Sequence, residues 1–117
     1  MLQITPQHRL LLAVKPVDFR KGIDSLAALC RQTLNDDPFS GAIFIFTNRS
    51  RKAVKTLVYD GQGFWLCTKR FSRGKLSWWP KCDSNAYNIT VAQLNVLLYQ
   101  GRPDKIYVPK DWRKVTP

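Results

Sequence analysis

The sequence predicts a single α+β domain in which an antiparallel β-meander sheet is covered by two helices. The chain has 117 residues, which suits one compact domain and leaves no room for two ordinary ones. Two stretches repeat apolar residues at helical spacing, and short β-prone runs separated by turn residues lie between them. Hydrophobic residues make up 44% of the chain, enough to build a core, so we expect no extended disorder.

The N-terminal third predicts one strand and one helix. Residues 10–14 form a short apolar run that is typical of a strand, and Pro16 ends it. Between Ile23 and Leu34, apolar residues recur at three- and four-residue steps, which predicts a helix with one apolar stripe. Pro38 stops this helix, because the residue before a proline is disfavoured in the helical region.

The middle of the chain predicts the meander. Residues 42–46 are a continuous apolar, β-prone run, which is typical of a central strand buried on both faces. Strands over 53–59 and 64–69 follow, joined at 60–63 by the clearest hairpin signal in the chain, Asp-Gly-Gln-Gly. We expect residues 76–79 to form a fourth meander strand.

The second helix has the sharpest local signature. Thr90 and Gln93 have the spacing of a capping box, and Gly101 supplies a left-handed stop. Beyond it we expect a short strand over residues 106–108 and a basic tail over 102–117 that Trp112 anchors.

The charge balance points to a polyanionic partner. Nineteen Lys and Arg residues face eight acids, all of them Asp, so the formal net charge is +11. On so small a domain this excess most often indicates nucleic-acid binding. Alternate turns of a meander lie at the same end of the sheet, so the turns near residues 49–52 and 69–75 share one end. The predicted nucleic-acid-binding residues are Arg49, Arg51, Lys52, Lys69, Arg70, Arg73 and Lys75, with Arg20 and Lys21 extending the surface. The alternative is a rim of charges that only keeps the protein soluble.

Aromatic residues are interleaved with these charges. Exposed rings could stack on bases, but a small domain also needs its large side chains inside. We expect Trp65 and one of Trp78 and Trp79 in the core, and leave Phe71 open.

The remaining chemistry-bearing residues predict neither catalysis nor cofactor. Three widely spaced cysteines without a C-x-x-C pair indicate reduced thiols in a cytoplasmic protein, with neither disulfide nor metal site. The apolar run at residues 10–14 is too short to cross a membrane or to serve as a signal peptide.

His8 is the one histidine, and Glu is absent, so Ser-His-Asp schemes and an acidic catalytic triad lack their parts. We therefore expect no enzyme.

Four blocks of the sequence are similar to one bacterial family. They include PVDFRKGID at 16–24, DPFSG at 37–41, FIFTNR at 44–49 and DGQGFWL at 60–66. In this order they resemble the small Orf2, or TnpB, accessory protein of IS66-type insertion sequences, which is not the RNA-guided nuclease of the same name. The resemblance covers about residues 7–101. Phe19 stands where Met is usual, Cys67 and Thr68 replace an aromatic pair, and the tail departs from the family pattern.

The resemblance implies a part in DNA transposition, beside a separate and larger transposase. We therefore expect a non-enzymatic accessory that binds DNA, at the ends of the mobile element, or helps to assemble the complex with that transposase; a homo-oligomer stays open. One alternative is a single-strand or RNA-binding module that uses the sheet aromatics Phe44, Phe46 and Trp65. The other is a small metal-dependent nuclease that uses carboxylates such as Asp18, Asp60, Asp83 or Asp111.

Overall fold

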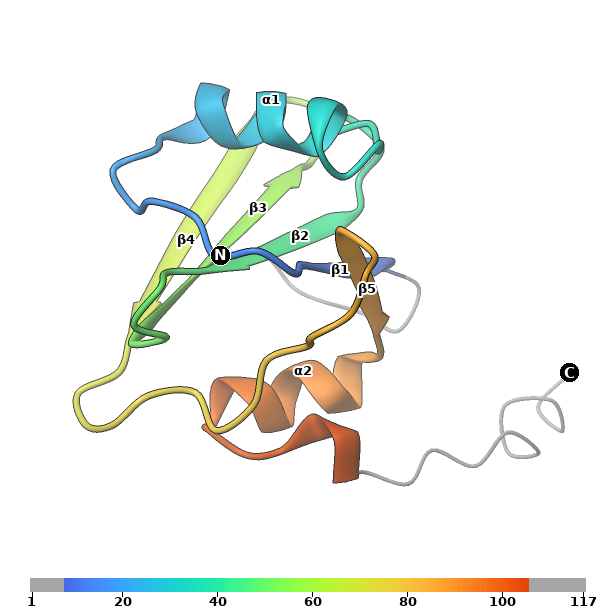
Figure 1. Cartoon of the computed structure of the whole chain (residues 1–117). Coiled ribbons are helices and arrows are strands. Elements are labelled where there is room, and N and C mark those ends of the chain that lie inside the picture. Colours follow the sequence, from blue (N-terminus) through green and yellow to red (C-terminus); the bar gives the residue numbers. More distant parts are fainter. Residues whose placement is uncertain (1–7, 106–117) are drawn as a thin grey trace, which may run out of the picture.

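The computed structural model describes residues 8–105 and shows a five-stranded sheet with one helix on each face (Figure 1). The elements are β1 (Leu10–Ala13), α1 (Ile23–Gln32), β2 (Ile43–Thr47), β3 (Ala53–Tyr59), β4 (Phe64–Arg70), β5 (Ala86–Ile89), α2 (Val91–Leu98) and the short 3₁₀ helix η1 (Pro103–Lys105). The expected α+β class is confirmed. The expected strand over residues 106–108 and Trp112 lie outside the described residues.

The sheet is mixed, so the prediction of a purely antiparallel sheet is wrong. Its strand order is β4-β3-β2-β1-β5, and β1 pairs with β2 in parallel while the other pairs are antiparallel. The reason is the crossover: α1 carries the chain back over the sheet, so β2 runs in the same direction as β1. The antiparallel meander itself exists, but only from β2 to β4.

The two central strands are buried on both faces, as predicted for residues 42–46. Leu12 and Ile45 belong to the core on the α2 face, whereas Leu11, Phe44 and Phe46 belong to the core on the α1 face. Successive side chains of a strand point to opposite faces, so a strand between two helical layers must be apolar throughout. This explains the unbroken hydrophobic runs of β1 and β2.

The segment between β4 and β5 differs most from prediction. Residues 76–79 form no strand, and β5, which the sequence did not predict, occupies the edge beside β1. Trp79 is buried, as expected for one of Trp78 and Trp79. Its indole N–H donates to the carbonyls of Ala13 and Val14, both at 3.1 Å. Trp65, in contrast, is 41% exposed, so its predicted place in the core is wrong. Its indole N–H donates to the Asp60 carboxylate in the hairpin.

The capping box of α2 is confirmed, but its stop lies one residue earlier than predicted. Thr90 Oγ1 accepts from the Gln93 N–H, and Gln93 Oε1 accepts from the Thr90 N–H. The left-handed residue is Gln100, with φ of 63°, and not Gly101. Gly101 is needed for close approach, because a Cβ there would lie 2.6 Å from Val96 Cγ1.

Candidate nucleic-acid interface

Three loops meet at one end of the sheet. Since β1 and β2 are parallel and the meander reverses direction twice, β1, β2 and β4 all point the same way. Their following loops therefore emerge together, toward the left of Figure 1. We call this end, formed by residues 16–22, 48–52 and 69–76, the basic end.

Hydrogen bonds lock these loops to one another. The N–H groups of Phe71 and Leu76 donate to the carbonyls of Lys52 and Arg51, at 3.0 and 2.9 Å. The Val17 N–H donates to the carbonyl of Thr47 at the end of β2, at 2.9 Å. The three loops therefore form one surface with a defined backbone arrangement.

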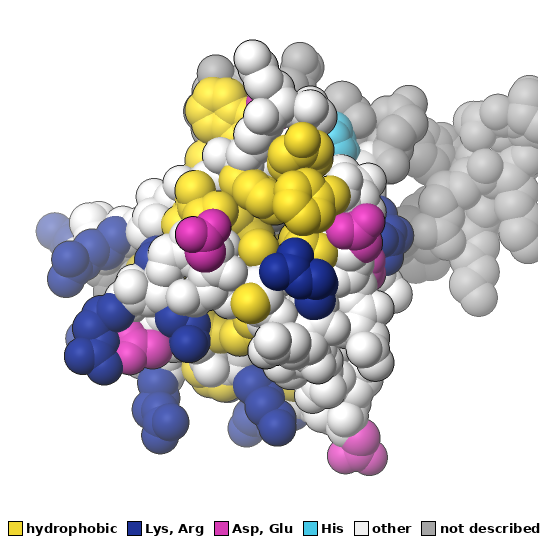
Figure 2. Space-filling view, turned by 90° about the horizontal axis from the view of Figure 1, so that it is seen from above, with side chains coloured by type: hydrophobic (Ala, Val, Ile, Leu, Met, Phe, Trp, Pro, Cys, Tyr) yellow, Lys and Arg dark blue, Asp and Glu magenta, His cyan; other side chains and the backbone are white. Residues whose placement is uncertain are grey.

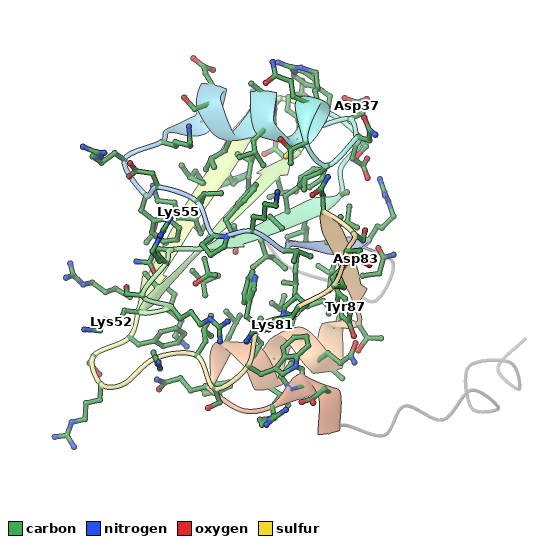
Figure 3. All side chains as sticks on the ribbon, in the orientation of Figure 1. Asp37, Lys52, Lys55, Lys81, Asp83 and Tyr87 are labelled. Carbon is green, nitrogen blue, oxygen red and sulfur yellow. The ribbon has the colours of Figure 1, made fainter. Side chains whose placement is uncertain are left out.

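All the predicted basic residues lie at this end. Arg51 is half-buried and the others are exposed: Arg20, Lys21, Arg49, Lys52, Lys69, Arg70, Arg73 and Lys75. Seen from above, most of the visible Lys and Arg side chains lie along the left and lower edges (Figure 2). Lys52 lies at the left of the molecule in Figure 3. The structure thus brings together the two turns that the sequence placed together, and adds the loop of Arg20 and Lys21. Their contact with a nucleic acid stays a prediction.

Arg20 has a partner within its own loop. Its guanidinium lies 2.7 Å from the Asp18 carboxylate, which also accepts from the Arg20 backbone N–H. The hydrogen bonds from Arg20 lower the pKa of Asp18 to about 2. The N-cap of α1 is Gly22, and no side chain among the described residues accepts from the first N–H groups of this helix. Asp18 therefore bonds within its own loop and does not cap α1. The carboxylate of Asp18 thus offsets the positive charge of Arg20.

Two lysines hold elements of this end in place. Lys69 Nζ donates to the Leu98 carbonyl at the C-terminus of α2, at 2.6 Å, where a cation also complements the helix dipole. Lys55 Nζ donates to the carbonyls of Phe19 and Lys21, at 2.7 and 3.1 Å, and so fixes the loop before α1. Sequence reasoning missed Lys55, although a lysine inside an otherwise apolar strand is a signal of such a bond.

A groove of about 510 Å³ opens beside the carboxyl ends of β1 and β2. Residues 16–19 form one wall and residues 48–50, with Arg49 among them, form the other. The groove therefore gives the basic end a concave part.

Several carboxylates accept hydrogen bonds from groups near them. Asp60 lies at the opposite end of the sheet and accepts from the N–H groups of Gln62 and Gly63, which lower its pKa. Asp36 accepts two hydrogen bonds from the Arg9 guanidinium. Within residues 8–105, no three His, Cys or Asp side chains gather in a group that could hold a metal ion.

The sheet aromatics and the cysteines were also considered in the sequence as functional groups. Phe44 and Phe46 are fully buried, so they cannot stack on bases, and the alternative of a sheet-based RNA-binding module loses two of its three aromatics. The three cysteines are free, and burial raises the pKa of the Cys30 thiol to about 12, which makes it unreactive.

Fold and surface together define a small basic α+β protein with nine of its basic residues gathered at one end of the sheet. The chain matches the family of IS66 Orf2-like proteins over residues 8–105, and it belongs to that family. The family match confirms the resemblance seen in the sequence and fits an accessory protein of an insertion sequence.

Two curated relatives come from Sinorhizobium fredii (strain NBRC 101917 / NGR234). The uncharacterized protein y4hO is 39% identical over 98 residues, which cover 84% of this chain and 84% of that protein. The uncharacterized protein y4jC is 32% identical over 103 residues, covering 83% and 88%. No solved structure matches the chain. Among the described helices, none has the length and apolar character needed to cross a membrane.

Proposed function

We propose that this protein is a DNA-binding accessory of insertion-sequence transposition that carries out no chemistry itself. The basic end would lie against the phosphate backbone at the ends of the element, beside the separate transposase. The observation that carries the proposal is the gathering of the predicted basic residues on three loops that backbone hydrogen bonds lock together.

Folding alone does not favour this arrangement. Like charges repel, and a chain of net charge +11 would lower its free energy by spreading them. A polyanion reverses the sign of this effect, because each phosphate contact releases counterions from DNA. Apart from the half-buried Arg51, the predicted basic side chains are exposed, so a ligand can reach them without unfolding the protein.

The same end carries no matching set of acids. Asp18 lies there but is paired with Arg20, while Asp60 and its hairpin lie at the other end. A surface of this kind can hold a phosphate backbone, but it does not present the clustered carboxylates of a two-metal nuclease.

Salt dependence of DNA binding tests the proposal. Each phosphate contact adds about 0.9 to the magnitude of the log–log slope of affinity against salt concentration. The pair Arg49→Ala/Arg51→Ala and the pair Arg70→Ala/Arg73→Ala should each lower this slope by up to about 2. The measurement is a titration of each variant against one duplex at several salt concentrations, with thermal melts alongside.

The control is Arg9→Ala/Arg31→Ala, which removes two positive charges elsewhere, one of which, Arg9, is paired with Asp36. Arg9 precedes β1, and Arg31 lies in the last turn of α1, away from the three loops (Figure 1). This control should change the slope much less than either test pair. Undetectable DNA binding by the parent protein at low salt would contradict the proposal, as would a control pair that loses most of the slope.

A further inference from the structure

Tyr99 is the most exposed large hydrophobic side chain among the described residues. It is 84% exposed, against 52% for Phe39 and 41% for Trp65. Phe39 contacts the rings of Tyr59 and Phe64, with centroids at 4.9 and 5.1 Å, and Trp65 is bonded to Asp60. Tyr99 instead follows α2, where the helix meets the basic end.

The ring of Tyr99 lies beside one cation of the basic end, Lys69. Lys69 Nζ lies 4.9 Å from the centroid of this ring and 5.6 Å from that of Phe71, so the ammonium group contacts two aromatic faces. The bond from Lys69 to the Leu98 carbonyl keeps the ammonium group at this place. One side of the Tyr99 ring is therefore supported, while most of its surface stays open to solvent.

The backbone beside Tyr99 is tied to the loop of Arg73 and Lys75. Gln100 Nε2 donates to the carbonyls of these two residues, at 2.8 and 3.1 Å. Ser77 Oγ donates to the carbonyl of Gln100. These bonds set the end of α2 beside the basic loop, although Gln100 is 27 and 25 residues away from Arg73 and Lys75 in the sequence.

We infer that Tyr99 is a stacking platform for an unpaired base of a DNA strand whose phosphates follow the loop of Arg73 and Lys75. The inference rests on the proposed function and narrows its substrate: the preferred DNA has a single-stranded part, such as an overhang or an opened end. Stacking of bases on exposed aromatic rings beside a cationic groove is the usual way to bind single strands. A base paired inside a duplex keeps its faces covered and cannot use such a ring.

A protein partner is the competing occupant of Tyr99. Aromatic residues that anchor protein partners lie at the desolvated centre of an apolar patch. The Tyr99 ring instead contacts the ammonium group of Lys69, and the next residue, Gln100, is bonded to the backbone of the loop of Arg73 and Lys75. This setting favours a ligand that offers both a π-face and negative charge.

The test compares two single strands of equal charge. One is a short oligothymidylate, and the other is an abasic strand of the same length, which keeps the phosphates but lacks the bases. The parent protein should bind the oligothymidylate more tightly. Tyr99→Ala should lose this preference, with a loss of affinity for oligothymidylate of about five-fold or more, the lower end of what one stacked base contributes. Tyr99→Phe should retain the preference.

Controls separate this inference from the proposed function. Binding to a blunt duplex should be unchanged in Tyr99→Ala, and Phe39→Ala, at another exposed aromatic, should leave both single strands unaffected; melts verify that each variant folds. Equal binding of both strands by the parent, or a preference that survives in Tyr99→Ala, would overturn the inference while duplex binding still supports the proposed function. If the parent protein did not bind duplex DNA at all, both the proposed function and this inference would be overturned.

Discussion

Basic side chains at and beside the basic end differ in whether they already have a bonding partner within the protein. Lys69 is bonded to the end of α2, and Lys55 to the loop before α1, so both contribute to the fold. Arg20 is paired with Asp18. Arg49 lines the open groove instead. The sequence shows that these residues are cationic and clustered, but partners such as the Leu98 carbonyl become visible only when distant elements are placed.

Arg20→Ala should raise the pKa of Asp18 from about 2 toward the ordinary value of about 3.9. The reason is that hydrogen bonds from the Arg20 guanidinium stabilise the ionised carboxylate. Because the pKa of Asp18 is lower in the folded state, its contribution to stability is present above about pH 4 and is lost as pH falls toward 2. An NMR titration of the Asp18 carboxyl carbon measures the shift.

Asp60 is the internal control for this titration. The backbone N–H groups of its own hairpin lower its pKa, so Arg20→Ala should leave its titration unchanged. An Asp18 carboxyl that titrates equally in the parent and in Arg20→Ala would show that the ion pair does not form in solution.

Elements with strong local signals were predicted correctly, and those that depend on distant partners were not. The capping box of α2 and the hairpin after β3 are encoded within a few residues, and both are present. β5 is four residues long, and its strand identity depends on pairing with β1, more than 70 residues earlier. Residues 76–79 have a strand-like composition, but Trp79 uses its indole to pack against the end of β1.

The sequence contains a pattern from which the parallel pairing of β1 with β2 could have been predicted. Two unbroken apolar runs separated by one amphipathic helix are typical of a β-α-β unit with both faces covered. The burial of β2 was predicted, but the direction of its neighbour was not, because the meander after β2 favoured an antiparallel arrangement throughout.

Thr90→Ala should lower the free energy of unfolding by about 1 kcal/mol. The substitution leaves the Gln93 N–H without its acceptor at the start of α2 and removes one half of the capping box. Chemical denaturation measures the change in the midpoint at constant slope. Thr33→Ala, at an exposed threonine that ends α1, is the matched control and should change stability less. Equal effects of the two substitutions would mean that the capping bond does not stabilise α2.

Among residues 8–105, charge is distributed unevenly over the molecule. The basic end collects cations on three loops, whereas Asp37 precedes β2 and Asp83 lies beside β5, at the edge of the sheet opposite β4 (Figure 3). Asp60 lies in the hairpin at the other end. Under the proposed function, we expect the described cations to attract a polyanion mainly toward the basic end, which would set the orientation of the complex as well as its affinity.

The same distribution predicts that the purified protein does not cut DNA. Two-metal hydrolysis needs carboxylates that converge on a pair of ions, next to the phosphate that is cut. At the basic end Asp18 is held by Arg20, and the Asp60 carboxylate is held in its hairpin at the far end of the sheet. Supercoiled plasmid incubated with the protein and Mg²⁺ or Mn²⁺ should therefore stay intact, as measured by gel electrophoresis against a protein-free sample. Nicking that requires the metal and disappears in Asp18→Asn, but persists in Asp60→Asn, would place catalysis at the basic end and replace the accessory role with a nuclease.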